Sequence, residues 1–178
     1  MNEKTIFRAS LERKEVPVCV STRIRENLFS YEPFLKADNV FIYVSLPTEP
    51  DTLCIIQALL RKGKRVAVPR CGPRPQMEAR LISDLMELKP GKLGIPEPPD
   101  TAPEMPKPDV AVIPCLACDR LFHRIGHGAG YYDAYLSRTG CLSVCLCPSN
   151  CLFPEIPNDE YDIKPGAVIT ENGILLRS

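Results

Sequence analysis

Asp109-Val-Ala-Val-Ile-Pro114 is a short apolar run that begins at an aspartate and ends at a proline. A run of this kind is typical of a strand whose two faces are both covered, as in a parallel sheet that has helices on each side. Proline cannot donate a ladder hydrogen bond, so the strand is expected to end there.

The segments around this run alternate between strand and helix patterns. Further strands are expected at residues 39–45, 65–69, 76–82, 141–147 and 167–170, with an edge strand at 173–176. Helices are expected over residues 2–15, from an N-cap at Ser21, over residues 51–62 with Gly63 as the C-cap, and over residues 131–138. The Pro/Gly-rich stretch from Lys89 to Pro108 is expected to be a long surface excursion. The alternation predicts an α/β fold with helices on both faces of a sheet, and residues 1–178 are expected to form one domain.

The composition is that of an ordinary soluble globular protein, with 44% apolar and 25% charged residues. Lys+Arg and Asp+Glu both number 22, and this neutral balance argues against a nucleic-acid-binding protein, which usually carries a basic excess. No apolar run approaches the ~20 residues that span a bilayer. The polar N-terminal segment lacks the apolar centre of a signal peptide. We therefore expect a cytoplasmic protein whose nine cysteines are reduced. We also expect a monomer.

The segment Arg124-Ile-Gly-His-Gly-Ala-Gly-Tyr-Tyr-Asp133 lies between a predicted buried strand and a predicted helix. Its alternate glycines allow a tight turn whose exposed N–H groups, with the helix N-terminus behind them, suit phosphate oxygens. Arg124 adds a planar cation for the same anion, and Asp133 is placed where a carboxylate could hold Mg²⁺ against the phosphates. The spacing differs from both the dinucleotide fingerprint and the P-loop. The glycines alone would also fit a simple turn into a helix, but the whole string is far more specific.

The full string RxGxGxGYYD resembles the signature of the 5-formyltetrahydrofolate cyclo-ligase family, whose members are also called 5,10-methenyltetrahydrofolate synthetases. The resemblance covers nearly the whole chain. Other segments that resemble family blocks are Lys4–Arg8, Tyr43–Thr52, Val68–Arg70, Gly94–Pro98, Ile156–Asp162 and Ile169–Glu171.

The resemblance implies a three-layer α/β sandwich with a mostly parallel central sheet flanked by helices. It also implies that the protein uses ATP and Mg²⁺ to convert 5-formyltetrahydrofolate to 5,10-methenyltetrahydrofolate, with release of ADP and phosphate. In the implied reaction the formyl oxygen is phosphorylated and N10 then attacks the activated carbon.

The resemblance also implies roles for individual residues. Lys4 and Arg8, on the N-terminal helix, would contact the ATP phosphates and act with Arg124 as catalytic cations. The ATP loop would comprise Arg124, Ile125, Gly126, His127, Gly128, Ala129, Gly130, Tyr131 and Tyr132. Asp133 and Asp162 would bind Mg²⁺. The folate would contact Val44, Glu49, Tyr131, Tyr132 and Tyr135.

The chain departs from the family pattern at several positions. Ala129 stands where the family usually has Lys or Gly, and Cys118 replaces the usual Phe. A catalytically inactive binding module for RNA or protein is therefore an alternative function. The retained cations and both aspartates favour the enzyme, and the neutral net charge disfavours RNA.

A second alternative concerns the zinc-type residues Cys115, Cys118, His123 and His127. A zinc finger would need about a dozen residues between its two pairs, and only four residues separate these pairs. Cys145, Cys147 and Cys151 alternate along a predicted strand and its exit, where burial explains them.

Overall fold

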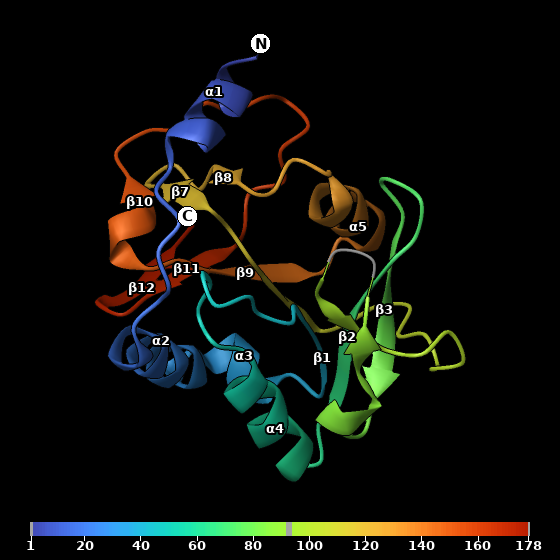
Figure 1. Ribbon diagram of the computed structural model, residues 1–178. Helices are drawn as coiled ribbons and strands as arrows, with labels where there is room; N and C mark the ends of the chain where they lie inside the picture. The colour runs from blue at the N-terminus through green and yellow to red at the C-terminus, as the bar shows by residue number, and fades with distance from the viewer. Residues whose placement is uncertain (1, 92–93, 178) are drawn as a thin grey trace.

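The structure is a computed structural model that describes residues 2–91 and 94–177. Its centre is a seven-stranded sheet of order β12-β11-β9-β6-β1-β2-β3 (Figure 1). The inner neighbours are all parallel, whereas the two edge strands β12 and β3 are antiparallel to their neighbours. The strands are β1 (Asn39–Ile42), β2 (Arg65–Cys71), β3 (Met77–Ile82), β6 (Val110–Ile113), β9 (Leu142–Leu146), β11 (Ala167–Thr170) and β12 (Gly173–Leu176). The predicted, mostly parallel sheet is confirmed.

Side chains that alternate along each strand build two cores, one on each face of the sheet. Val40 and Ile42 of β1 pack with the helices α2 (Val18–Ser30), α3 (Glu32–Lys36) and α4 (Leu53–Arg61). Phe41 points the other way, toward α5 (Tyr131–Thr139). Because both faces are covered, the central strands are apolar throughout, and the expected three layers are present.

A small second sheet completes the layer that contains α5. It has the order β10-β7-β8 and consists of β7 (Ala117–Asp119), β8 (Arg124–Ile125) and β10 (Leu152–Phe153). The helix α1 (Glu3–Ser10) lies over this sheet (Figure 1), and the ring of Phe7 meets that of Phe153 edge-on at 5.4 Å. The N-terminal segment is thereby brought to the β7–β8 hairpin that leads into the glycine-rich loop.

Four short elements remain in the described part of the chain, and two of them, β4 and β5, lie in the stretch that was expected to be a surface excursion. The four are η1 (Leu85–Glu87), β4 (Lys89–Pro90), β5 (Pro96–Glu97) and η2 (Ser149–Cys151). The expectation for residues 89–108 is partly wrong, because Glu97, Ala102 and Met105 are buried. Residues 92 and 93 of that stretch lie outside the described residues.

Two predicted helix boundaries are wrong. The N-terminal helix ends at Ser10 rather than continuing to residue 15, because the polar segment after Leu11 has no apolar stripe to bury. Ser21 is not an N-cap, since α2 begins at Val18 after Pro17. Ser21 is buried inside the helix, and its hydroxyl accepts a hydrogen bond from the Asp51 backbone N–H at 3.2 Å.

Within residues 2–91 and 94–177, no helix combines the length and the apolar character that crossing a bilayer requires.

Candidate active site

A cavity of about 850 Å³ opens beside the carboxyl ends of β1 and β2. This is where open α/β sheets bind their ligands. Nearly all of the sequence-predicted site residues line it. Those residues are Lys4, Arg8, Val44, Glu49, Arg124, Ile125, Gly126, His127, Gly128, Ala129, Gly130, Tyr131, Tyr132, Asp133 and Asp162. Residues from both ends of the chain and from its middle are thus brought to one space.

The glycine-rich loop runs from β8 into α5 and uses left-handed backbone conformations at two of its glycines. Gly128 has φ of +85° and Gly130, the N-cap of α5, has φ of +73°. Both conformations are strained for residues that carry a Cβ. The loop therefore needs glycine for its turn, as the sequence predicted.

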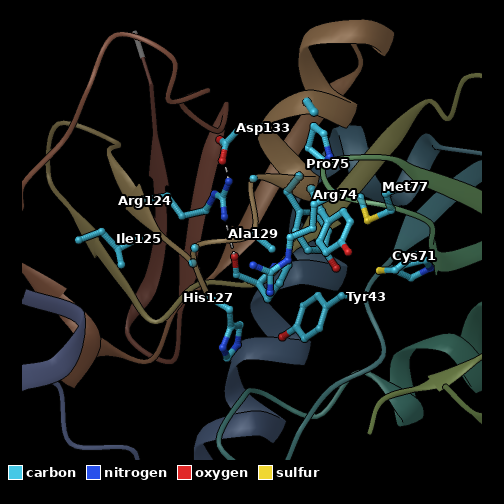
Figure 2. A pocket seen from close by; sticks show the side chains of 18 of the residues that line it. Tyr43, Cys71, Arg74, Pro75, Met77, Arg124, Ile125, His127, Ala129 and Asp133 are labelled. Carbon is cyan, nitrogen blue, oxygen red and sulfur yellow. Dashed lines mark hydrogen bonds and ion pairs between the residues drawn. The ribbon is translucent and has the colours of Figure 1, made fainter. Parts of the chain in front are cut away.

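Arg124 and Asp133 form the central ion pair of the site, shown in Figure 2. Arg124 Nη2 donates to Asp133 Oδ1 at 2.8 Å, and Nη1 donates to the Pro114 carbonyl at 3.4 Å. Burial opposes the charge of Arg124, but the nearby Asp133 carboxylate raises the net pKa of the guanidinium. A permanently charged and positioned cation therefore lies at the start of the glycine loop.

The helix α1 adds two more cations to the same end of the cavity. Arg8 Nε donates to the Gly126 carbonyl at 2.8 Å. Lys4 pairs with Asp162 and, at 2.6 Å, with Asp159. Lys4 and Arg8 are four residues apart, so they share one face of the helix. That face is directed at the loop and at the 159–162 segment.

Glu49 lies at another part of the cavity wall and is held in place from two sides. Its Oε2 accepts a hydrogen bond from the Leu46 backbone N–H at 2.9 Å, and its Oε1 lies 3.3 Å from His127 Nε2. Burial, followed by the charge of Glu49, raises the pKa of the nearby Tyr132 phenol well above its ordinary value. A fixed carboxylate and a neutral phenol thus lie beside the loop.

Tyr135 is the one predicted site residue that the structure places elsewhere. It is buried, with its ring 4.6 Å from that of Phe41 in the core. It lies one helical turn beyond Tyr131, on the face of α5 that packs against the sheet, and so it does not line the cavity. Tyr135 is therefore a core residue, and the prediction that it lines the ligand cavity is wrong.

Several cavity residues were missed by the sequence analysis. Tyr43 directly follows β1, Arg74 lies in the β2–β3 connection, Met77 in β3 and Glu97 in β5. Figure 2 shows Arg74 and Met77 on the wall opposite Arg124. Arg74 and Met77 lie outside every segment that resembles the family. Tyr43, Glu97 and Asp159 could have been suspected, because they belong to the matched segments Tyr43–Thr52, Gly94–Pro98 and Ile156–Asp162.

Asp119 is a buried carboxylate that fixes the hairpin which carries Arg124. It accepts backbone N–H groups from Leu121, His123 and Ile156 at 2.9–3.2 Å. Its Oδ2 also lies 2.8 Å from His123 Nδ1. Asp119 therefore ties the β7–β8 hairpin to the segment that approaches Asp159 and Asp162.

We expect Asp119→Ala to lower the free energy of unfolding by about 3 kcal/mol, because it removes a buried carboxylate and leaves three backbone N–H donors without their acceptor. Asp109→Ala is the matched control. Asp109 also accepts backbone N–H groups, from Asp38 and Asn39, but it is exposed, and its loss should cost about 1 kcal/mol. Urea denaturation followed by circular dichroism measures both. Equal losses in the two variants would contradict the role of Asp119.

The chain is similar in sequence to proteins of one known family. The model of the 5-formyltetrahydrofolate cyclo-ligase family matches residues 7–171. A probable 5-formyltetrahydrofolate cyclo-ligase of Schizosaccharomyces pombe is 30% identical over 159 residues, which are 79% of this chain and 78% of the relative. The 5-formyltetrahydrofolate cyclo-ligase of Mycolicibacterium smegmatis is 29% identical over 170 residues, or 89% of this chain and 87% of the relative.

A solved structure agrees with the sequence matches. The NMR structure of Aquifex aeolicus 5,10-methenyltetrahydrofolate synthetase is similar to this chain, with a TM-score of 0.79 and 26% sequence identity. The similarity covers 97% of this chain and 88% of that one. The resemblance therefore holds for the whole layered fold as well as for the glycine-rich loop.

Proposed function

Because this chain belongs to the 5-formyltetrahydrofolate cyclo-ligase family, a family of ATP-dependent ligases, we propose that it converts 5-formyltetrahydrofolate to 5,10-methenyltetrahydrofolate. The reaction consumes ATP and releases ADP and phosphate. One observation supports the proposal most strongly. Lys4 and Arg8 from α1 meet Arg124 and the glycine loop in the same cavity, although more than a hundred residues separate them in sequence.

The chemistry requires positioning and charge more than a side-chain nucleophile. The formyl group on N5 is a poor electrophile because the nitrogen donates into the carbonyl, and its oxygen is a poor leaving group. Transfer of the γ-phosphoryl group to that oxygen solves both problems, and N10 then attacks the carbon while phosphate leaves. Phosphoryl transfer is catalysed mainly by alignment and by neutralisation of phosphate charge. Lys4, Arg8 and Arg124 would supply that neutralisation.

We assign the Mg²⁺ that accompanies ATP to Asp133 and Asp162. Carboxylate oxygens are the ligands that this hard cation prefers. The Ile163 N–H donates to Asp133 Oδ1 at 3.2 Å, and this brings Asp162, its chain neighbour, close to Asp133. Bound Mg²⁺ would add positive charge against the phosphate oxygens. Arg124 and Lys4 neutralise the two carboxylates, and both cations would also face the phosphates of the nucleotide.

The folate is proposed to lie on the side of the cavity that holds Val44, Glu49, Tyr131 and Tyr132. A buried carboxylate can accept pterin N–H groups, and aromatic side chains pack on flat rings. The Glu49–His127 contact links this side to the glycine loop, so the formyl oxygen and the γ-phosphate would meet near His127.

Turnover tests the proposal directly. Protein mixed with 5-formyltetrahydrofolate and Mg-ATP should produce the near-ultraviolet absorbance of the methenyl product, and omission of ATP should abolish it. A protein that binds either ligand without forming product would instead support the inactive binding module.

Gly128 provides a sharper test of the loop. A Cβ at this position would come within 3.1 Å of Arg8 Cζ, in a backbone conformation that disfavours any side chain. We expect Gly128→Ala to cost about 1–2 kcal/mol of stability and also to raise the KM for ATP, because Arg8 must move.

Gly63→Ala is the matched control for this loop variant. Gly63 has φ of +72° at the end of α4, and a Cβ there would meet no heavy atom within 4 Å in the described part of the chain. It should lose similar stability at an unchanged KM for ATP. If both variants leave that KM unchanged, Arg8 does not contact the nucleotide.

A further inference from the structure

Four cysteines that take no part in the proposed reaction meet in one buried cluster. Cys115 follows β6, Cys118 lies in β7, Cys145 lies in β9, and Cys147 follows β9. Their exposed fractions are 7%, 0%, 0% and 0%. Two pairs that are about thirty residues apart in sequence thus converge where the small sheet packs on the main one.

The sulfur atoms of this cysteine cluster have the spacing of a metal site. The Sγ atoms of Cys115, Cys118 and Cys147 all lie within 4.8 Å of one another. The Sγ atom of Cys145 is 3.5 Å from that of Cys118. Sulfurs around a tetrahedral zinc ion lie about 3.8 Å apart, because Zn–S bonds are about 2.3 Å long. The group of three sulfurs does not include Cys145, so the Cys145 side chain would have to rotate for its sulfur to become the fourth corner of the tetrahedron.

We propose that Cys115, Cys118, Cys145 and Cys147 bind a single structural Zn²⁺ ion through their thiolates. Sulfur donors select zinc over the hard cation that accompanies ATP, so the two sites differ in chemistry. The ion would join β7 to the end of β9. This inference does not depend on the proposed function.

The charge around the cluster supports this assignment. Zn²⁺ with four thiolates carries a net charge of −2, which is costly in the interior unless a cation compensates it. Arg124 is such a cation, since it is buried and interacts electrostatically with Cys145, Cys118 and Cys115. Within residues 2–91 and 94–177, its buried Nε has no hydrogen-bond partner. Metal-bound thiolates commonly accept such a donor.

The histidines that the sequence pairs with these cysteines do not belong to the site. His123 lies 2.8 Å from Asp119, and His127 contacts Glu49. The ligands come instead from β9 and its exit, where the sequence analysis attributed Cys145 and Cys147 to burial alone. Burial of reduced thiols as small apolar groups is the outcome that would overturn the proposal.

Metal analysis of the wild-type protein, purified under reducing conditions with Zn²⁺ supplied, tests the assignment. We expect one tightly held zinc per chain. X-ray absorption at the zinc edge should show a first shell of sulfur at about 2.3 Å. A protein that neither retains zinc nor takes it from a chromophoric chelator would overturn the proposal, as would a nitrogen and oxygen shell.

Variants locate the ion. Cys118→Ser and Cys147→Ser should each weaken zinc binding by more than the roughly 10–100-fold that loss of a second-shell partner costs. Cys19→Ser and Cys54→Ser change exposed cysteines and should retain stoichiometric zinc. Zinc that survives both cluster variants would contradict the assignment. If a cluster variant fails to fold, the Co²⁺ spectrum of the wild-type protein still decides, because tetrahedral thiolate coordination gives intense d–d bands and other coordination does not.

Discussion

Asp133→Ala is expected to abolish turnover, with a loss of at least about a thousandfold in kcat. The change removes a proposed Mg²⁺ ligand. It also removes the carboxylate that holds Arg124 Nη2 at 2.8 Å and that accepts the Ile163 N–H. Initial rates of methenyl product formation at saturating Mg-ATP and folate measure the effect.

Asp159→Ala is the matched control for this variant. Asp159 lines the same cavity and pairs with Lys4, but it is half-exposed and is not a proposed metal ligand. We expect its turnover to stay within a few-fold of wild type, since an exposed ion pair contributes little. Near-normal rates in Asp133→Ala would refute the metal assignment.

Arg124→Ala is expected to raise the KM for ATP by about 10–100-fold, the cost of a charged hydrogen bond to phosphate. The side chain is buried and held in place by Asp133 and the Pro114 carbonyl, so no other cation can take the position of its guanidinium group. Steady-state kinetics at varied ATP and saturating folate measure the change. An unchanged KM would remove Arg124 from the nucleotide site.

Arg120→Ala controls for charge alone, because Arg120 lies on the same hairpin but is exposed. Arg124→Lys separates charge from shape, since lysine keeps the charge without the planar fork.

In the Arg124/Asp133 double variant, the loss of activity should be much smaller than the sum of the losses in the two single variants, because each residue positions the other.

Most of the fold could be predicted because its signals are local. Apolar runs such as Val110–Ile113 identify buried strands without any knowledge of their neighbours. The boundaries that failed depend on tertiary context. Ser21 is a residue type that favours N-caps, but it lies inside α2, where its hydroxyl accepts a hydrogen bond from the Asp51 N–H. Residues 12–15 could form a helix, but they are exposed and pack on no other element.

In the candidate site too, some residues could be predicted from a local motif, whereas others are placed only by tertiary packing. The glycine loop and Asp133 form one continuous motif, so their position in the cavity follows from the sequence. Tyr135 lies in the same helix, but its orientation toward Phe41 depends on how α5 packs on the sheet. Arg74 and Met77 reach the cavity only because β2 and β3 form an antiparallel hairpin beside it. The cysteine cluster required knowledge of the β6–β9 register, which pairs Ile113 with Cys145.

The helix α1 buries none of its residues fully, and eight residues are too few for a stable isolated helix. It is held by the Phe7–Phe153 contact and by polar contacts of Lys4 and Arg8, the same side chains that would grip the triphosphate. Occupancy of the cavity and ordering of the chain's beginning are therefore thermodynamically linked. The bound nucleotide would hold α1 in its ordered position. The observed affinity for the nucleotide would then be lower than its intrinsic affinity, because part of the binding free energy is used to order this helix.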